Sequence, residues 1–248
     1  MVKTKRKLVQ DKIAVITGAN RGLGKAISKV FVNEGATVVL LGRNEGSLIA
    51  VRDEFFNMGG KADICVCDLS NDGQIYAAKD EILKKHGFID ILVNNAGIET
   101  DLPFLEMPMD MFDDMMRINF RQLVIMTRAV LPSMMERKYG NIVNIASAAG
   151  ERGLPGSTAY SASKAAVINF SQTLGEEMRN YNIRVNCLNP GLLDTELFWQ
   201  SASKDYLLEK CGDLIDLNTV GYSAAFLASD LSEGLTCQSI TVRGISRW

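Results

Sequence analysis

Short runs of hydrophobic residues alternate along the chain with longer stretches whose apolar positions recur at helical spacing. The runs are rich in Val and Ile, which is typical of strands that are buried on both faces. They predict seven strands, at residues 13–17, 37–41, 62–67, 89–93, 141–145, 183–187 and 239–242.

The stretches between these runs predict helices. In the first of them, Leu23, Ile27, Val30 and Phe31 share one helix face, and Gly35 is a stop signal. Further helices are expected from the second strand to Met58 and at 71–86, 110–136, 160–180 and 218–229. Strands and helices in alternation predict an α/β fold, a doubly wound Rossmann fold whose seven-stranded parallel sheet is flanked by helices.

The 248 residues contain no linker or repeat, so we expect a single domain over 1–248. Residues 1–9 form a basic, solvated tail in this prediction. The stretch 192–218 breaks the alternation and carries Phe198 and Trp199. It is interpreted as a substrate loop or lid at the carboxyl edge of the sheet, with an ordinary packed helix pair as the alternative.

Composition excludes several classes of protein. A net charge of −2 gives no reason to expect nucleic acid as a partner. No apolar run reaches the ~18 residues of a membrane span, and no signal peptide is recognisable. The five cysteines form no C-x-x-C pair, and His86 is the only histidine. We therefore expect reduced thiols, a cytoplasmic location and no metal site.

Glycines lie between the first strand and the first helix, in the sequence T-G-A-N-R-G-L-G of residues 17–24. Glycines there permit a tight turn and let the backbone approach a pyrophosphate at the N-terminus of the helix. A purely structural turn is the alternative. The predicted cofactor contacts in this loop are Gly18, Asn20, Arg21, Gly22, Leu23 and Gly24.

The end of the second strand bears on which dinucleotide is bound. An acid there would bind the ribose 2′-hydroxyl of NAD, but the chain has Arg43 and Asn44 and no acid until Glu45. Arg43, with Arg21, is suited to a 2′-phosphate. We therefore predict NADP(H) over NAD(H), unless Arg43 is only an exposed helix-start residue.

The ends of the third and fourth strands complete the predicted cofactor site. Asp68 and Leu69 follow the third strand, where Asp68 is placed to accept from the adenine amine. Asn95, Ala96 and Gly97 follow the fourth strand, and their small size permits close approach of the nucleotide.

Ser147, Tyr160 and Lys164 are the candidate catalytic residues. The tyrosine and the lysine are four residues apart, so they share one face of a helix. An ammonium beside a phenol lowers its pKa toward the range useful for proton exchange. A serine hydroxyl beside them is suited to hold a carbonyl oxygen.

Together these residues resemble the short-chain dehydrogenase/reductase family over nearly the whole chain. The matching motifs are T-G-x-x-x-G-x-G at 17–24, N-N-A-G at 94–97, Asn119, Ser147, Y-x-x-x-K at 160–164, and P-G at 190–191 followed by Thr195. They occur in the family's order and at its spacing.

The resemblance implies a role for each residue. Tyr160 gives a proton to a carbonyl or takes one from an alcohol, and Ser147 orients the oxygen. Lys164 lowers the pKa of Tyr160 and binds the nicotinamide ribose, while Asn119 holds a water that links Lys164 to solvent. The carboxamide is fixed by Pro190, Gly191, Leu193 and Thr195.

The C-terminal sequence departs from the family's pattern. Cys237 stands where the family often has glycine, and Arg243 where it has an acid. These changes affect the expected C-terminal turn and subunit contact. The resemblance implies a homo-oligomer, a dimer or tetramer packed through helices near 110–135 and 160–180.

Several substrates remain open for this ketone or secondary-alcohol oxidoreductase. A bulky apolar compound such as a hydroxysteroid or bile acid is favoured, with Leu154, Phe198 and Trp199 as its apolar wall. The alternatives are a 3-oxoacyl thioester of fatty-acid synthesis, a sugar or polyol, and a non-catalytic NADP(H)-binding regulator. An enoyl reductase is disfavoured by the Tyr160–Lys164 spacing.

Overall fold

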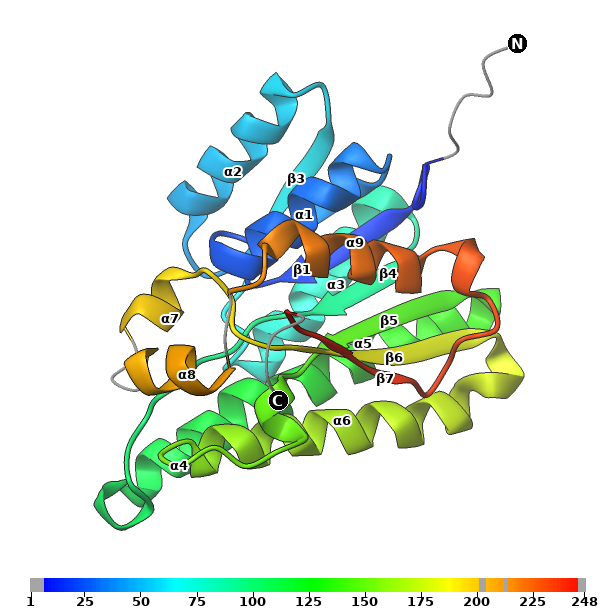
Figure 1. Ribbon diagram of the computed structural model, residues 1–248. Helices are drawn as coiled ribbons and strands as arrows, with labels where there is room; N and C mark the ends of the chain where they lie inside the picture. The colour runs from blue at the N-terminus through cyan, green and yellow to red at the C-terminus, as the bar shows by residue number, and fades with distance from the viewer. Residues whose placement is uncertain (1–6, 201–203, 212–213, 245–248) are drawn as a thin grey trace.

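The computed structural model describes residues 7–200, 204–211 and 214–244. Its centre is a seven-stranded sheet in the order β3-β2-β1-β4-β5-β6-β7, and every neighbouring pair is parallel (Figure 1). The strands are β1 Ile13–Thr17, β2 Thr37–Gly42, β3 Lys61–Val66, β4 Ile91–Asn94, β5 Gly140–Ile145, β6 Ile183–Pro190 and β7 Ser239–Val242. The predicted sheet is confirmed, and β4 begins two residues later than expected.

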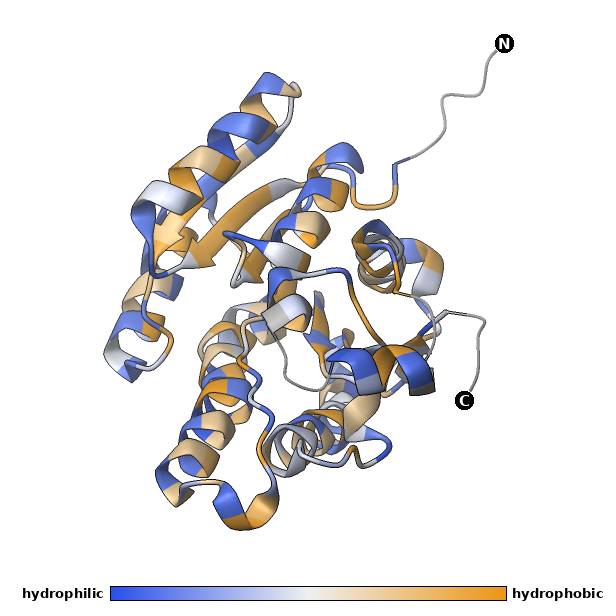
Figure 2. Cartoon of the chain, turned by 60° about the vertical axis from the view of Figure 1, so that its left-hand side comes forward, coloured by the Kyte–Doolittle hydropathy of each residue, from blue (hydrophilic) through white to orange (hydrophobic). Residues whose placement is uncertain are grey.

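Two layers of helices cover the sheet. One layer holds α1 (Gly22–Asn33), α2 (Glu45–Asn57) and α9 (Leu217–Ala228), whose apolar residues share a core with one face of the strands. The other layer holds α3 (Asp72–His86), α5 (Gln122–Arg137) and α6 (Thr158–Met178). In Figure 2 the strands are coloured mainly as hydrophobic, whereas the helices carry both kinds of residue. Burial of both sheet faces explains the Val- and Ile-rich strands.

The strand order reverses beside β1, because β2 pairs with one edge of β1 and β4 with the other. In an open parallel sheet, this switch point leaves a crevice at the carboxyl ends of the strands. The segments that follow β1, β4 and β5 therefore meet at one place, which is where the predicted chemical residues lie.

The helix predicted over 110–136 is interrupted. It consists of α4 (Met109–Met116), a π-helical turn η2 (Arg117–Arg121) and α5. A π turn inserts one residue into a helix and often marks a functional position. Asn119 lies in this turn and is buried.

The segment predicted as a lid contains two short helices, α7 (Glu196–Gln200) and α8 (Lys204–Cys211). Phe198 and Leu207 are buried there in one apolar cluster with Leu154 and Leu192. The segment thus contains a pair of helices and is closed by a bridge between Leu193 and Ile215, and its role as a substrate loop or lid stays a prediction.

The predicted basic tail is shorter than residues 1–9. Val9 is fully buried, and its N–H donates to the carbonyl of Glu34 at 3.2 Å. Leu8 N–H donates to the Glu34 carboxylate at 2.9 Å. Apolar Leu8 and Val9 therefore belong to the folded part of the chain, while residues 1–6 lie outside the described residues.

Candidate active site

A cavity of about 960 Å³ lies at the carboxyl edge of the sheet. Of the predicted site residues, Asn119 alone is not part of its lining. The others are Gly18, Asn20, Arg21, Gly22, Leu23, Gly24, Arg43, Asn44, Asp68, Leu69, Asn95, Ala96, Gly97, Ser147, Tyr160, Lys164, Pro190, Gly191, Leu193 and Thr195. The fold thus brings residues from six strand ends to one cavity.

The glycine loop is packed too closely for side chains. Gly18 and Gly22 have φ of 66° and 52°, in the left-handed region that favours glycine. A Cβ on Gly24 would overlap the carbonyl oxygen of Gly18. Bare backbone therefore faces the cavity where α1 begins, and this cradle fits a dinucleotide pyrophosphate.

The loop is fastened to the neighbouring strand β4. The Thr17 hydroxyl accepts from the N–H groups of Asn95 and Ala96 at 2.9 and 3.1 Å. The Asn95 side chain donates to the Thr17 carbonyl at 3.0 Å. Asn95 therefore braces the nucleotide loop from behind with its side chain.

The two arginines of the cofactor region have different surroundings. Arg43 is exposed at the cavity wall after β2. The pKa of Asp68 is lowered by hydrogen bonds from Ser70 and, to a smaller extent, by the Arg43 charge. Arg21 donates to the Glu196 carboxylate at 3.1 Å. Arg43 is therefore the better placed of the two to receive a 2′-phosphate beyond β2.

Asn44 has a structural task. Its side-chain oxygen accepts from Ser47 N–H at 2.9 Å and caps the N-terminus of α2. An asparagine cap satisfies one of the free N–H groups of the first helical turn. The cap fixes the start of α2 immediately after Arg43.

Ser147, Tyr160 and Lys164 converge from β5 and α6. Ser147 follows β5, and its hydroxyl accepts from Ala149 N–H at 3.1 Å. Tyr160 and Lys164 are one turn apart in α6, with the ammonium 5.6 Å from the centre of the phenol ring. Lys164 Nζ donates to the carbonyl of Ile145 at 3.0 Å. The serine, the phenol and the ammonium therefore line one wall of the cavity.

The electrostatics of this group differ from the sequence-based expectation. Burial, and then the charge of Glu99, raise the pKa of Tyr160, while the Ser147 hydroxyl acts in the opposite direction. Burial lowers the pKa of Lys164 to about 8. The pKa of Tyr160 is therefore raised on balance rather than lowered, because desolvation dominates, and the lowering expected from Lys164 stays a prediction. Tyr160 keeps its proton at neutral pH.

Asn119 acts on a loop from behind the cavity wall. Its side-chain oxygen accepts from Ile98 N–H at 2.8 Å, and its amide donates to the Ile98 carbonyl at 2.9 Å and to Ser163 Oγ at 3.0 Å. Both amide hydrogens are thus engaged by protein atoms. The water-holding role that the resemblance implied for Asn119 stays a prediction.

Sequence reasoning missed Glu99. This acid lines the cavity with Tyr160 and Lys164, and burial raises its pKa to about 7. The pattern that marked the fourth strand ended at Gly97, and only the presence of an acid two residues later could have drawn attention to it.

The other side of the cavity is apolar. Leu154, Leu192, Phe198 and Leu207 line it. Trp199, predicted as part of this wall, is not among the lining residues; it is half exposed, and its indole N–H donates to Asp194 at 2.7 Å. The aromatic surface of the substrate side therefore comes from Phe198.

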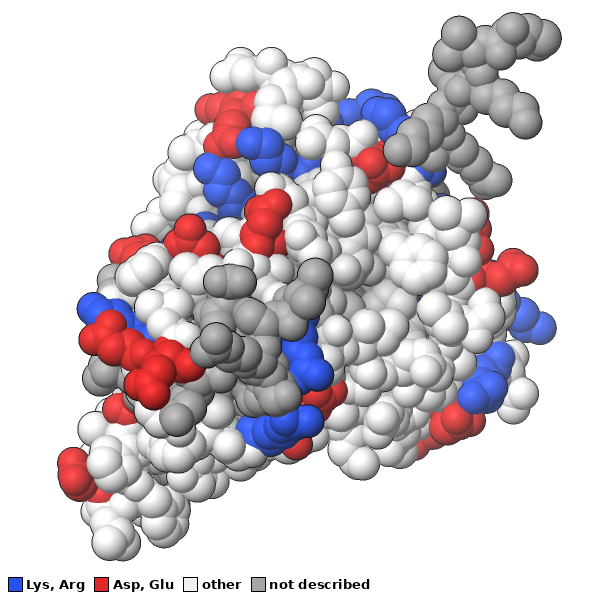
Figure 3. Space-filling model, in the orientation of Figure 1, with Lys and Arg blue, Asp and Glu red and all other residues white. Residues whose placement is uncertain are grey.

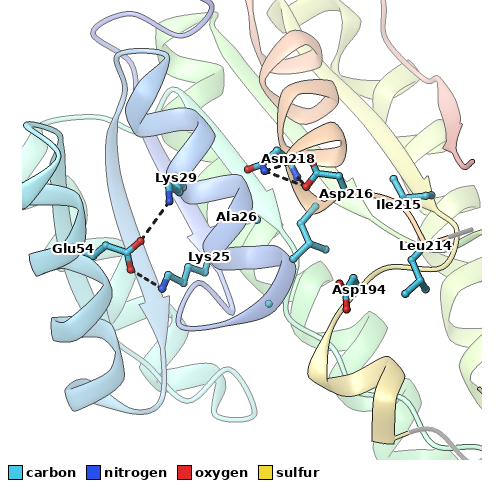
Figure 4. A pocket seen from close by; sticks show the side chains of 11 residues that line it. Lys25, Ala26, Lys29, Glu54, Asp194, Leu214, Ile215, Asp216 and Asn218 are labelled. Carbon is cyan, nitrogen blue, oxygen red and sulfur yellow. Dashed lines mark hydrogen bonds and ion pairs between the residues drawn. The ribbon is translucent and has the colours of Figure 1, made fainter.

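A second hollow lies outside the glycine loop, between α1, α2 and the start of α9 (Figure 4). Its polar groups are already engaged within the protein. Glu54 contacts Lys25 at 2.6 Å and Lys29 at 3.7 Å, and Asp216 accepts from Asn218. Because the predicted site residues lie together in the larger cavity, we assign the chemistry there.

The described residues also bear on metal binding, membrane spans and surface charge. Within residues 7–200, 204–211 and 214–244, no group of His, Cys, Asp and Glu is arranged to hold a metal, and no helix is long and apolar enough to cross a membrane. Cys65, Cys67, Cys187 and Cys237 are free thiols. On the face in Figure 3, cations and carboxylates lie in small mixed groups rather than in a broad positive field.

Comparison with known proteins agrees with this geometry. The pattern of the family described as short chain dehydrogenase matches residues 12–206. The 3-oxoacyl-[acyl-carrier-protein] reductase FabG of Chlamydia muridarum is 35% identical over 244 residues, covering 96% of this chain and 98% of that one. The FabG of Thermotoga maritima is 35% identical over 240 residues, covering 95% and 98%.

A solved structure extends the likeness. The gluconate 5-dehydrogenase from Burkholderia cenocepacia, in complex with NADP and tartrate, is 32% identical with a TM-score of 0.91, covering 96% of each chain. The chain belongs to the short-chain dehydrogenase/reductase family. It is an NAD(P)-dependent oxidoreductase that acts on CH–OH groups.

Proposed function

We propose that this protein reduces 3-oxoacyl thioesters to 3-hydroxyacyl thioesters with NADPH. The observation that carries the proposal is full-length similarity to FabG reductases from distant bacteria, at 35% identity. The sequence alone favoured a hydroxysteroid or bile acid and kept the thioester as its alternative. The similarities support that alternative better than the steroid.

The protonation of the site supports the direction of reduction. Because burial raises the pKa of Tyr160, the phenol is held in the form that donates a proton. A carbonyl oxygen at the cavity wall can accept from the hydroxyls of Ser147 and Tyr160, which hold and polarise it. As the carbonyl carbon gains a hydride, the oxygen takes the Tyr160 proton and becomes a hydroxyl.

A bound nicotinamide supplies the hydride for this step. The protein's part is to place the two reactants and to replace the proton. Lys164 lies one turn from Tyr160 with a pKa of about 8, so it carries a charge that stabilises the phenolate left by each turnover. A proton from solvent then restores Tyr160.

NADPH, rather than NADH, is proposed from the end of β2. Arg43 is exposed at the cavity wall, and Glu45, the nearest following acid, begins α2 rather than ending β2. A guanidinium binds a phosphate through paired hydrogen bonds. The NADP bound in the gluconate 5-dehydrogenase structure adds support.

The test is a substrate panel with NADPH, in which loss of the cofactor's absorbance reports turnover. The panel contains a 3-oxobutanoyl thioester of N-acetylcysteamine, a steroid ketone and a keto-sugar acid. We expect kcat/KM for the thioester to be at least about tenfold higher than for the other two compounds. A fit to the cavity that gains more than one methylene contact would give a ratio of this size. Faster reduction of the steroid ketone would return the assignment to the hydroxysteroid hypothesis.

A further inference from the structure

Glu99 is an acidic group in the substrate half of the cavity that the proposed reaction does not use. It lines the cavity together with Ser147 and Tyr160. Its charge acts on both members of the catalytic pair, because it raises the pKa of Tyr160 and that of Lys164. Whatever occupies the space beside the Tyr160 hydroxyl therefore lies within the field of this carboxylate.

The loop that carries Glu99 is held at both ends. On one side, Asn119 binds both backbone groups of Ile98. On the other, Leu102 N–H donates to the Gly156 carbonyl at 2.9 Å, and the Ser157 hydroxyl donates to Asp101 at 3.0 Å. The backbone on either side of Glu99 is therefore fixed at the edge of the cavity that Glu99 lines.

Two charged groups lie near enough to Glu99 to shift its pKa. Asp101 comes from the same loop, and Lys164 comes from α6. Behind Lys164, burial raises the pKa of the Cys187 thiol on β6 to about 12, so Cys187 is neutral. Two carboxylates thus face one ammonium.

The surroundings preserve this field. Leu154, Phe198 and Leu207 also line the cavity, and none of these three side chains carries a charge that would screen Glu99. Between charges several ångströms apart near a protein interior, the interaction is several times stronger than in water. A second negative charge beside the reacting carbonyl is therefore disfavoured.

We propose that Glu99 is a specificity-determining residue that rejects substrates with a free carboxylate near the reacting carbonyl and admits the corresponding esters and thioesters. The inference rests on the proposed function, since it explains how an acyl thioester is chosen over the free 3-oxo acid. It also means that an acidic keto-sugar is refused.

The selection depends on pH in a defined direction. Burial raises the pKa of Glu99 to about 7, so its carboxyl gains its charge between pH 6 and pH 8. Lys164, whose pKa is about 8, loses positive charge at the upper end of the same range. Both changes make the cavity more negative as pH rises, and rejection of the free acid strengthens.

The experiment compares two substrates with the same ketone, ethyl 3-oxobutanoate and 3-oxobutanoate, using the holoenzyme with NADPH. The acid is ionised throughout pH 6–8. In the wild type, we expect the preference for the ester in kcat/KM to rise by about tenfold over this range. In Glu99→Gln, the preference is smaller and rises less with pH, because only Lys164 still changes its charge. Glu233→Gln, which removes an exposed charge after η5, is the matched control and behaves as wild type.

An ester preference that is equal in wild type and Glu99→Gln, or that does not change with pH in wild type, overturns the inference. Absence of turnover with both compounds contradicts the proposed function instead. In that case, binding of the same pair is followed by the fluorescence of NADPH in the complex. Tighter binding of the acid to Glu99→Gln than to wild type supports the charge selection, and equal binding overturns it.

Discussion

Asn119 holds Ile98 by both of its backbone groups, with distances of 2.8 Å to the N–H and 2.9 Å to the carbonyl oxygen. One side chain in the π turn thereby pairs with a loop residue as a neighbouring strand would. The preceding residue, Gly97, is packed so closely that a Cβ there would lie 3.0 Å from Asn119 Oδ1 and 3.5 Å from Lys164 Nζ. Asn119 therefore sets the distance between this loop and Lys164.

Replacing Asn119 by Ala is expected to lower kcat/KM and stability together. Two backbone groups of Ile98 and the Ser163 hydroxyl lose a buried partner, which costs about 1–3 kcal/mol in the free energy of unfolding. Denaturant titration measures the stability, and NADPH oxidation measures the activity. Asn119→Asp is the comparison: it keeps the acceptor for Ile98 N–H, removes the donors and adds a buried carboxyl group, so it is also expected to be less stable than wild type.

Replacing Tyr160 by Phe is expected to reduce turnover by about 10²–10⁴-fold while leaving NADPH binding nearly unchanged, because only the proton donor is removed. Ser161→Ala is the control, since Ser161 Oγ is a buried hydroxyl beside Tyr160 that has no hydrogen-bond partner among the described residues. The measurement is kcat alongside the dissociation constant of NADPH. A Tyr160→Phe protein with wild-type kcat would remove the phenol from the mechanism.

Replacing Arg43 by Ala is expected to weaken NADPH binding by about tenfold, as a charge-assisted phosphate contact is worth about 1.5–3 kcal/mol and water partly replaces it. NADH, which lacks the 2′-phosphate, is expected to bind equally to both proteins. Arg21→Ala is the matched variant, and its effect is expected to be smaller because Arg21 is shared with Glu196. Parallel titrations with both cofactors measure the difference; a wild type that binds NADH more tightly would contradict the assignment.

Replacing Glu99 by Gln is expected to stabilise the protein above pH 7 by about 2 kcal/mol. The folded pKa of about 7 lies above the ordinary value of 4.5, so the folded state binds more protons than the unfolded state between these values. Wild-type stability therefore falls as pH rises from 4.5 to 7, and the variant lacks this loss. A pKa difference of one unit corresponds to about 1.36 kcal/mol. The expected gain in stability is smaller than the full difference, because Glu99 is partly exposed and because the variant loses the attraction between Glu99 and Lys164.

Urea titrations at pH 4 and pH 8 measure this gain in stability, with Glu233→Gln as the control. The Glu99→Gln protein should match wild type at pH 4, where the Glu99 carboxyl is protonated in both the folded and the unfolded chain, and exceed it at pH 8. A stability difference equal at both pH values would contradict the raised pKa of Glu99.

The sheet was predictable because its central strands are buried on both faces and each strand is followed by a separate turn signal. The cofactor half of the site was predictable for the same reason, since Gly18, Arg43, Asp68 and Asn95 each follow a strand and parallel strands end at one edge. The π turn was not predictable, because its apolar spacing continues that of α4 and α5.

The electrostatics of the candidate active site could also not be predicted from the sequence. The Tyr160–Lys164 spacing showed that the two side chains are close, but not that Lys164 is buried, that Tyr160 is partly buried or that Glu99 joins them. Burial depends on which loops cover the site, and those contacts come from the tertiary fold. The half-exposed position of Trp199 has the same origin, since its ring is fixed by Asp194 and by an edge contact with Phe198 at 5.2 Å.

The turn before β7 departs from the sequence pattern of the family at Cys237. Cys237, which stands where the family often has glycine, has a φ of 61°. A residue with a Cβ pays about 1–2 kcal/mol in this left-handed conformation, and glycine does not. The chain keeps the turn nonetheless: Cys237 N–H donates to the Val185 carbonyl at 2.8 Å, and β7 pairs with β6.

Replacing Cys237 by Gly is therefore expected to raise the free energy of unfolding by about 1 kcal/mol, because relief of the backbone outweighs the thiol contact that is lost. Cys237→Ala is the matched control: it removes the same thiol and keeps the Cβ, so it is expected to be no more stable than wild type. Thermal unfolding under reducing conditions compares the three proteins. If alanine and glycine stabilise equally, the gain comes from removing the sulfur near Gly175 and not from the backbone.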